Sequence, residues 1–394
     1  MENEAGTKDS AIEYENRLVS ARPIRLLIVA PSCDILGGQA IQASRLLERL
    51  GQEPGLEVGF LAINPRLPGL LRKLQSIKYL RTVLTAIVYM VSLCWRLWRY
   101  DIVHIFSASY FSFVLAPTPA ILISKFYGKK LLLNYHSGEA GDHLQRWRTA
   151  VHTIRLADEV VVPSDYLVGV FSNFGLRAKK ITNLIDVDKF RFRERRPLGS
   201  VFLSNRNFEA HYGVDRVLKA FAIIQKRIPD ARLIVAGDGP ERGNLRQLAG
   251  ELQLRNIEFT GRVPPGSISD LYNSADVFLN ASEIDNQPLS ILEAFACGLP
   301  VVTTDVGGIT EIVINERTGL VVPKGSTDQL AAGALRLLEH DSLAQEIITR
   351  AYKECAKYRW ETHRGQWLSI YEELQTLQGN HRPNYDPKGR VSPL

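Results

Sequence analysis

The segment from residue 282 to residue 308 carries the side chains with the clearest chemical potential. It reads SEIDNQPLSILEAFACGLPVVTTDVGG and follows an expected strand over Asp276–Asn280. We expect a short helix over Ser290–Cys297, ended by Gly298. A loop that leads into a helix at the carboxyl end of a parallel strand offers free backbone N–H groups and a positive helix dipole. Both favour an anionic ligand such as a diphosphate.

Two carboxylates in this segment lie eight residues apart. Asp285 stands in the loop, and Glu293 lies on the first turns of the expected helix, where it could face a ribose. The alternative is an ordinary crossover between two strands, with both carboxylates solvated. The segment alone does not separate these two interpretations.

Other residues that could contact a nucleotide also follow expected strands. Arg206 comes directly after Ser200–Ser204 and could meet a phosphate, although a lone arginine is usually a surface residue. Ala236–Pro240 (AGDGP) is a turn after a strand, and such turns are common. Gly37 and Gly38 follow the first strand without the full G-x-G-x-x-G spacing, so they are a weak dinucleotide-binding signal, and a close approach of the backbone to another ligand is equally compatible with them.

The elements that must position these residues recur along the chain as short apolar runs, each followed by a segment of helical periodicity. Buried parallel strands have this pattern because helices cover both faces of their sheet. Two such series predict two doubly wound α/β domains. The candidate strands are Ile24–Ala30, Ile102–Phe106, Lys130–Asn134, Glu159–Val162, Ser200–Ser204, Arg232–Ala236, Ile257–Thr260, Asp276–Asn280, Pro300–Thr303 and Gly319–Val322.

The boundary between the two series is expected near residues 190–198, where the charged run RFRERRP interrupts the strand pattern. The predicted organisation is a disordered tail over 1–20, a first domain over 21–195, a second domain over 196–359, a helix over 360–378 and a disordered tail over 379–394.

Composition excludes several classes of protein. With 45% hydrophobic and 23% charged residues among 394, the chain has the make-up of a soluble globular protein. Lys and Arg exceed Asp and Glu by only 48 to 42, so no nucleic-acid partner is expected. Four cysteines without a C-x-x-C pair indicate neither a disulfide framework nor a zinc site. The first 20 residues are polar and partly acidic, unlike a signal peptide, and we expect a cytoplasmic location.

Taken together, these residues resemble the GT-B glycosyltransferases of family 4 over roughly residues 24–378. The matching pieces are Gly37-Gly38, Tyr135-His136, Pro163-Ser164, Asn183–Phe190, Gly237–Pro240, Gly261-Arg262, Leu292–Val302, Gly307-Gly308 with Glu311, and Thr318-Gly319. The resemblance implies two Rossmann-like domains facing across a cleft, the first on the acceptor side and the second binding a nucleotide-sugar donor. It also implies transfer with retention and without an essential metal or other cofactor, and a final helix that crosses back to the first domain.

The resemblance also implies roles for individual residues. They are His136 and Asp285 as catalytic residues, and Gly38, Arg206, Asn286, Gln287, Leu289 and Glu293 as donor-binding residues. Arg206 and the backbone amides of residues 286–289 would hold the diphosphate and the donor sugar, and Glu293 the ribose. For His136, the alternative is that it only caps the strand that precedes it.

Two positions depart from the family's pattern. The family usually has Glu where this chain has Asp285, so the carboxylate here is one methylene shorter. It usually has Lys where this chain has Tyr212, so one positive charge is missing unless His211, Arg262 or the helix dipole replaces it. These departures leave open a non-catalytic sugar-nucleotide or glycan-binding protein. A nucleotide-sugar epimerase of the same architecture is also open, although no second pair of carboxylates is evident in the first half.

Asp186-Val-Asp188 offers a competing interpretation, because a D-x-D could hold a metal on a nucleotide diphosphate. The motif lies in the expected linker between domains, and a full α/β series follows it. We therefore expect no metal site.

The stretch Arg66–Tyr100 contains seven basic residues and no acidic one, and it encloses the apolar run Val83–Trp95. That run is shorter than the roughly 20 residues needed to span a bilayer. Basic flanks with tryptophans suit a helix lying on an anionic membrane, whereas the alternative is a helix packed on the first sheet with a solvated basic rim. The first interpretation implies peripheral attachment to the cytoplasmic membrane face and a lipid or lipid-linked acceptor. Otherwise a glycan or a small molecule would be the acceptor.

Overall fold

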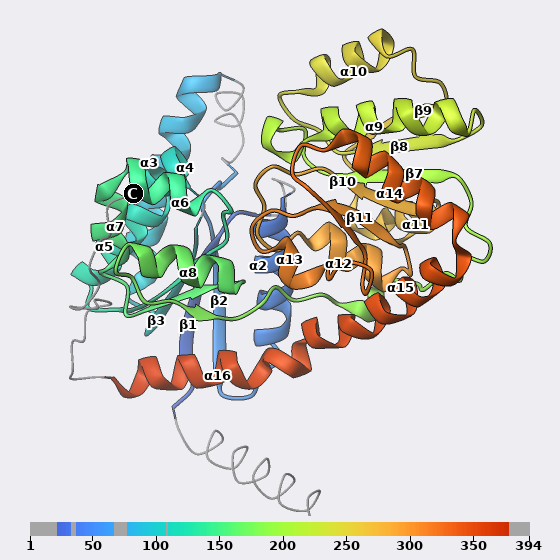
Figure 1. The fold of residues 1–394 in the computed structure, drawn as a ribbon. Coiled ribbons are helices and arrows are strands. Elements are labelled where there is room, and N and C mark those ends of the chain that lie inside the picture. Colours follow the sequence, from blue (N-terminus) through green and yellow to red (C-terminus); the bar gives the residue numbers. More distant parts are fainter. Residues whose placement is uncertain (1–21, 33–36, 67–76, 108, 378–394) are drawn as a thin grey trace, which may run out of the picture. The chain divides into compact units, whose positions relative to one another are not determined.

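The computed structural model describes residues 22–32, 37–66, 77–107 and 109–377 (Figure 1). The expected tails, 1–20 and 379–394, lie outside these residues. The chain groups into two compact units. The first unit comprises Met1–Val162, Val168–Lys180 and Arg364–Leu394, and the second comprises Pro163–Leu167 and Ile181–His363.

The first unit contains an all-parallel sheet in the order β2-β1-β3-β4-β5-β6. Because β1 pairs with both β2 and β3, the direction of winding reverses between β1 and β3. The strands are β1 (Ile24–Ala30), β2 (Leu56–Ala62), β3 (Ile102–Ser107), β4 (Lys130–Tyr135), β5 (Glu159–Val162) and β6 (Lys179–Lys180).

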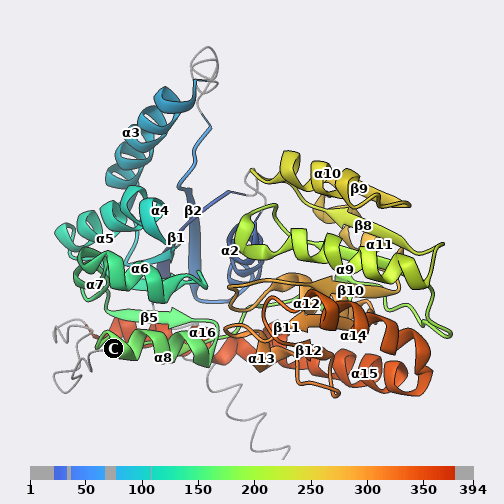
Figure 2. The same cartoon turned by 45° about the horizontal axis from the view of Figure 1, so that its top comes forward.

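Helices of the first unit pack on its sheet and on one another. Helix α5 lies against β3 and β4, α2 lies against β1 and β2, and α16 contributes Tyr371, which hydrogen-bonds the Nδ1 atom of His104 at 2.9 Å. Helix α3 projects from this unit, as Figure 2 shows. The helices are α2 (Gly38–Leu50), α3 (Lys78–Leu97), α4 (Tyr110–Leu115), α5 (Pro117–Phe126), α6 (Ala140–Arg146), α7 (Arg148–Ile154), and most of α8 (Asp165–Asn173) and α16 (Trp360–Thr376), whose first residues group with the second unit.

The second unit contains a parallel sheet in the order β12-β11-β10-β7-β8-β9. In chain order this is the doubly wound arrangement 6-5-4-1-2-3, whose direction reverses between its first and fourth strands, β7 and β10. The strands are β7 (Val201–Asn205), β8 (Arg232–Ala236), β9 (Ile257–Gly261), β10 (Val277–Asn280), β11 (Val301–Thr304) and β12 (Leu320–Val322).

Two hydrophobic layers hold this second sheet, one on each face. Successive strand residues alternate between them, so that Phe202 belongs to one layer and Leu203 to the other. Helices α9, α10 and α14 cover the first face, and α11, α12 and α13 cover the second (Figure 1). The helices are α9 (Val214–Arg227), α10 (Arg242–Glu251), α11 (Ile268–Asn273), α12 (Leu289–Ala296), α13 (Ile309–Ile312), α14 (Thr327–Glu339) and α15 (Asp341–Glu354).

The predicted fold class is confirmed, since the chain forms two doubly wound α/β units with parallel sheets. The division of the chain differs from the predicted 195/196 boundary, because residues 181–195 group with the second unit. Ile185 and Phe190 pack into its core, and the buried guanidinium of Arg195 donates to the backbone oxygens of Tyr272, Ala275 and Cys297. The charged run is therefore anchored to the second unit through Arg195, although most of its other residues are exposed.

Candidate functional site

The predicted donor-binding residues of the second unit gather where its sheet reverses direction. Arg206 follows β7, and the segment 281–288 follows the neighbouring strand β10. The amide of Arg206 donates to the carbonyl of Ala236, at the end of β8. In doubly wound sheets, ligands bind outside the carboxyl ends of the strands at this reversal point.

Arg206 is held on three sides. Its guanidinium forms an ion pair with Asp285 and donates a 3.2 Å hydrogen bond to the hydroxyl of Ser290. It also lies over the ring of Tyr212, with its central carbon 4.1 Å from the ring centre. The Nε atom is buried and has no hydrogen-bond partner among the described residues. Arg206 is thus fixed in orientation and retains a free donor.

Asp285 is anchored by its own loop as well as by Arg206. Its Oδ1 atom accepts from the amide of Asn286 at 2.8 Å, and its Oδ2 atom accepts from the hydroxyl of Ser282 at 3.3 Å. The amide of Asn286, which we expected to meet the donor, is therefore bonded to Asp285 in this structure. The charge of Asp285 is balanced by Arg206, and its predicted catalytic role stays a prediction.

Side chains of the loop before α12 fix the path of the backbone. Asn286 accepts a hydrogen bond from the hydroxyl of Ser164, and Gln287 accepts one from the amide of Asn183 at 2.6 Å. Gly307 has a positive φ of 51°, and an added Cβ there would collide with the backbone oxygen of Asp285. Asn286 and Gln287 therefore position the loop, and the Nδ2 atom of Asn286 is buried without a hydrogen-bond partner among the described residues.

Helix α12 begins at Leu289, after the extended residue Pro288, and no side chain caps its first turn. All eight of its residues are buried. An uncapped first turn leaves amides that a ligand can bond, together with the positive end of the helix dipole. The predicted helix terminus therefore lies in the same segment as Asp285, with Ser290 touching Arg206.

Glu293 lies in the second turn of α12 and is 5% exposed. Its Oε2 atom accepts a 3.1 Å hydrogen bond from the hydroxyl of Tyr272, which in turn accepts one from the side chain of Asn205 at 3.0 Å. Burial and the neighbouring carboxylate raise the pKa of Tyr272 well above its usual range, so it remains a donor. This contact fixes the carboxylate of Glu293 at the base of the site.

His136 and Gly38 belong to the first unit. His136 follows β4, and its ring stacks on Phe106 with centres 5.2 Å apart. Its Nε2 atom is buried with no partner among the described residues, and burial lowers its pKa to about 4. His136 is therefore neutral near pH 7. Gly38 begins α2 beside the reversal point of the first sheet, and an added Cβ there would meet nothing within 4 Å, which leaves room for a ligand.

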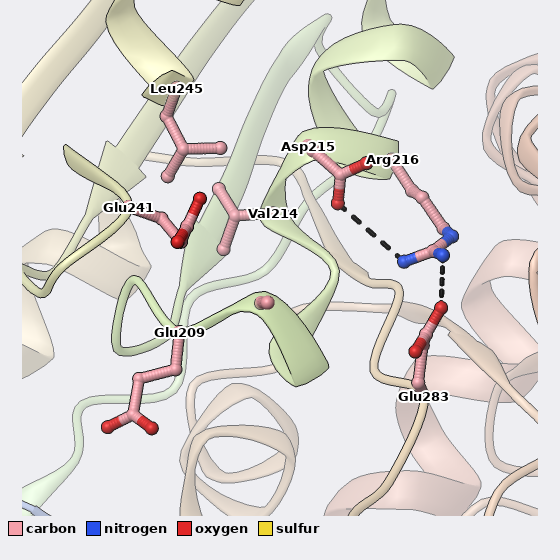
Figure 3. Close-up of a pocket in the computed structure, with 8 residues that line it drawn as sticks. Glu209, Val214, Asp215, Arg216, Glu241, Leu245 and Glu283 are labelled. Carbon is pink, nitrogen blue, oxygen red and sulfur yellow. Dashed lines mark hydrogen bonds and ion pairs between the residues drawn. The ribbon is translucent and has the colours of Figure 1, made fainter. Parts of the chain in front are cut away.

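A pocket of about 350 Å³ lies beside the Arg206 segment of the second unit (Figure 3). Arg216 forms ion pairs with Glu283 and Asp215 at one side of it. With four carboxylates and one arginine, it is unsuited to a diphosphate, and none of the predicted site residues lines it. Its lining residues are Glu209, Ala210, Val214, Asp215, Arg216, Glu241, Leu245 and Glu283.

The two aspartates of the D-x-D motif are occupied by basic side chains. Asp188 accepts two 3.0 Å hydrogen bonds from Arg359, and Asp186 forms a 3.2 Å ion pair with Lys189. Among the residues that the structure describes, no three or more His, Cys, Asp or Glu side chains form a group that could hold a metal ion.

The stack of Tyr212 on Arg206 was not predicted from the sequence, nor were Ser290 and Tyr272 as partners of the predicted residues. The only signal for Tyr212 was its place where the family usually has Lys. Nothing in the sequence pointed to Tyr272, because it reads as one more core aromatic of a short helix.

Comparison with known proteins gives matches along most of the chain. The model of glycosyltransferase family 4 matches residues 36–189, and the model of group 1 glycosyl transferases matches residues 186–354. Glycogen synthase of Mycobacterium tuberculosis is 28% identical over 305 residues, which cover 73% of this chain and 72% of the relative. Phosphatidyl-myo-inositol mannosyltransferase of Mycolicibacterium smegmatis is 27% identical, covering 67% of this chain and 64% of the relative.

Solved structures share the fold. Sucrose-phosphate synthase of Thermosynechococcus elongatus superposes with a TM-score of 0.73 at 20% identity, covering 90% of this chain and 99% of that one. Anabaena HepE in complex with UDP-glucose superposes with a TM-score of 0.70 at 19% identity, covering 90% and 100%. With consecutive family models matched from residue 36 to residue 354 and the fold shared, the chain belongs to the GT-B glycosyltransferases of family 4.

Proposed function

We propose that this glycosyltransferase moves a hexose from a nucleotide-sugar donor to its acceptor with retention at the anomeric carbon. The observation that carries the proposal is Arg206, fixed at the β7/β10 reversal point beside the uncapped first turn of α12. A diphosphate needs positive charge and free donors, and both are present there. The UDP-glucose complex of HepE supports a nucleotide sugar as the donor class.

In this proposal the second unit stabilises the leaving group. The diphosphate competes with Asp285 for the guanidinium of Arg206, and its developing charge is met by that guanidinium and by the amides at the start of α12. Such preorganised donors stabilise charge that grows in the transition state. Glu293, held by Tyr272, accepts from the ribose hydroxyls.

Retention implies attack from the face that the leaving group vacates, so the leaving phosphate can take the proton of the acceptor hydroxyl. No separate general base is required. Neutral His136 supplies a hydrogen bond to the reacting sugar or the acceptor through its unpartnered Nε2 atom. No essential metal is needed, because Arg206 and the helix terminus provide the positive charge.

The proposed acceptor is a lipid or lipid-linked glycan, reached from the cytoplasmic face of a membrane. Similarity to the phosphatidyl-myo-inositol mannosyltransferase supports a lipid acceptor, whereas similarity to glycogen synthase supports a soluble glycan acceptor. A small-molecule acceptor is the remaining alternative.

A second candidate is a protein that binds a sugar nucleotide without transferring the sugar. The observation that favours it is the ion pair of Arg206 with Asp285, which balances the charge that the diphosphate would use. Slow hydrolysis of the donor in the absence of acceptor separates the two, because only the enzyme breaks the glycosidic bond.

The donor assignment is tested with Glu293→Gln. Loss of the charge removes a charge-assisted hydrogen bond worth about 1.5–3 kcal/mol, so donor affinity should fall about 10- to 100-fold. The amide oxygen of Gln can still accept from Tyr272, which keeps the fold intact. Glu293→Ala should weaken binding at least as much, but it leaves the Tyr272 hydroxyl without this acceptor.

Calorimetric titration with a panel of nucleotide sugars measures these affinities. Glu258→Gln, on the exposed strand β9 and away from the site, is the matched control and should bind like the wild type. A folded Glu293→Gln protein with wild-type affinity for the donor would remove Glu293 from the site.

A further inference from the structure

Helix α3 has apolar side chains on its outer face as well as on its inner face. Tyr89, Leu93 and Leu97 form the inner stripe, and each is at most 1% exposed. The large apolar residues exposed on α3 and at its two ends are Ile77, Leu80, Val83, Ile87, Met90, Val91, Trp95 and Trp98.

The exposed residues follow the helical repeat. Val83, Ile87, Val91 and Trp95 are spaced by four, and Val91 stands two positions from both Tyr89 and Leu93. Two positions correspond to about 200° around an α-helix, so this outer stripe lies opposite the inner one. Trp95 is 71% exposed and Val91 59%. A surface helix of a soluble protein carries polar residues on that face, so this face is suited to an apolar medium.

The charge around the helix has one sign. Residues 66–100 contain no Asp or Glu and seven basic residues. Of these, Arg72 and Lys73 and the side chain of Lys78 lie outside the described residues. Arg81 and Arg96 are exposed near the two ends of α3, and the guanidinium of Arg99 lies 5.0 Å from the ring centre of Trp98. Cationic ends, exposed tryptophans and an apolar stripe match the headgroups and acyl boundary of anionic lipid.

We propose that the outer face of α3 binds the surface of an anionic lipid bilayer, with the helix lying on the membrane rather than crossing it. The proposal deepens the lipid acceptor named above, and only its link to catalysis rests on the proposed function. The membrane contact itself involves neither donor nor acceptor.

Contacts within the first unit explain why the helix lies on the surface. Leu80–Leu97 is long and apolar enough to span a membrane, with a mean hydropathy of 1.4. However, the hydroxyl of Tyr89 donates to the carbonyl of Ala116 at 3.0 Å, and the guanidinium of Arg96 donates to the carbonyl of Phe60 at 2.7 Å. Crossing a bilayer would break both contacts and strip the inner stripe from its own core. A helix that lies on the membrane surface keeps both hydrogen bonds and the packing of the inner stripe.

Adjoining helices add to the apolar surface. Helix α5, which packs against α3, exposes Leu122 and Phe126, and Phe126 is 88% exposed. Helix α4 exposes Phe111 and Val114. Figure 2 shows α4 and α5 beside the carboxyl end of α3 in the first unit. Exposed apolar area spread over neighbouring helices is typical of a docking surface.

The test is co-sedimentation of the full chain with vesicles of phosphatidylcholine, with and without phosphatidylglycerol, across a salt series. The wild type should bind the anionic vesicles at low salt and stay partly bound at high salt, because apolar burial resists screening. Replacing Ile87, Val91 and Trp95 together by Gln should weaken binding more than about tenfold. Replacing Arg72, Lys73, Lys78 and Arg81 by Gln should reduce the salt-sensitive part, since four of the seven basic residues are removed.

Ile314→Gln is the matched control, since it removes an exposed apolar residue of the second unit and should leave vesicle binding unchanged. Calorimetric donor affinity should be unchanged in every variant, so failure of this proposal is distinguishable from failure of the donor site.

Two results would overturn the proposal. One is a wild type that does not bind anionic vesicles, and the other is undiminished binding of the variant in which Ile87, Val91 and Trp95 are replaced. A wild-type dimer that the same variant converts to a monomer would assign the face to a second copy instead. Retention in membranes after alkaline carbonate extraction would indicate a spanning helix.

Discussion

Lowering the pH from 7 to 5 should destabilise the first unit, because three of its histidines, His104, His136 and His143, are held in the neutral form. His104 and His143 are both 0% exposed. Burial is the main cause that lowers the pKa of His104 to about 3 and that of His143 to about 4, from an ordinary value of 6.5. Nδ1 of His104 is paired with the hydroxyl of Tyr371, and Nδ1 of His143 with that of Tyr135.

The direction of the change in stability depends on whether the folded or the unfolded chain binds protons at the higher pH. As the pH falls below 6.5, the unfolded chain protonates these histidines while the folded chain does not, so stability is lost from about pH 6.5 down towards the folded pKa values. At pH 5 the loss is about 2 kcal/mol for each of the three histidines, or about 6 kcal/mol in all. That is a large share of the roughly 5–15 kcal/mol that stabilises a typical domain.

Urea titration followed by tryptophan fluorescence measures this loss. Of the five tryptophans, Trp95, Trp98, Trp147 and Trp367 belong to the first unit, and only Trp360 belongs to the second. The buried Trp367 lies 5.3 Å from the ring of His104, so the signal follows the region in question. The free energy of unfolding should therefore be lower at pH 5 than at pH 7.

His104→Asn removes one titrating group and should reduce the pH-dependent loss by about 2 kcal/mol, whatever it does to stability at pH 7. His152→Asn replaces an exposed histidine of α7 and should leave the loss unchanged. The same pH-dependent loss in His104→Asn as in the wild type would refute the argument that burial of this imidazole makes the first unit acid-sensitive.

Two further predictions concern the donor site. Tyr212→Phe should keep wild-type donor affinity in calorimetry, because the ring under Arg206 is retained, whereas Tyr212→Ala should weaken it about 3- to 10-fold. Equal losses in both variants would instead assign the effect to the hydroxyl. Transfer activity should persist in EDTA, since Arg206 and the start of α12 supply the positive charge. Activity lost in EDTA and restored by manganese or magnesium would contradict the metal-free mechanism.

Most strands could be predicted because they are buried on both faces, which leaves a continuous apolar run in the sequence. Ile24–Ala30, Arg232–Ala236 and Glu159–Val162 have the predicted bounds. Strand β2 was missed because Glu57 and Gly59 interrupt its run, and the gap at Gly59 is filled by the ring of Tyr100. Only the folded sheet shows that an aromatic residue from elsewhere supplies this missing apolar contact.

The length of helix α3 was underestimated for a different reason. The longest apolar run in the sequence is Val83–Trp95, whereas the helix runs from Lys78 to Leu97. Arg81, Thr82 and Arg96 end the apolar run but not the helix, because arginine is a good helix former and threonine is tolerated in a helix. Which of its two apolar stripes is covered depends on the packing of Tyr89 and Leu93, and the sequence contains no signal for that choice.

At the proposed donor site, a positive charge expected from the resemblance is missing, while Arg206 keeps its place. Where the resemblance led us to expect Lys, Tyr212 offers the guanidinium an aromatic face, which restricts its orientation but adds no charge. Asp285 is short enough to remain on its own loop and still reach Arg206, so the pair carries no net charge before a ligand arrives. A diphosphate must therefore displace one carboxylate and rely more on the start of α12, whose dipole contributes about half a positive charge. The departures at Asp285 and Tyr212 thus both act on the guanidinium of Arg206. In the proposed site, a donor would therefore recognise the fixed orientation of this guanidinium more than the number of positive charges.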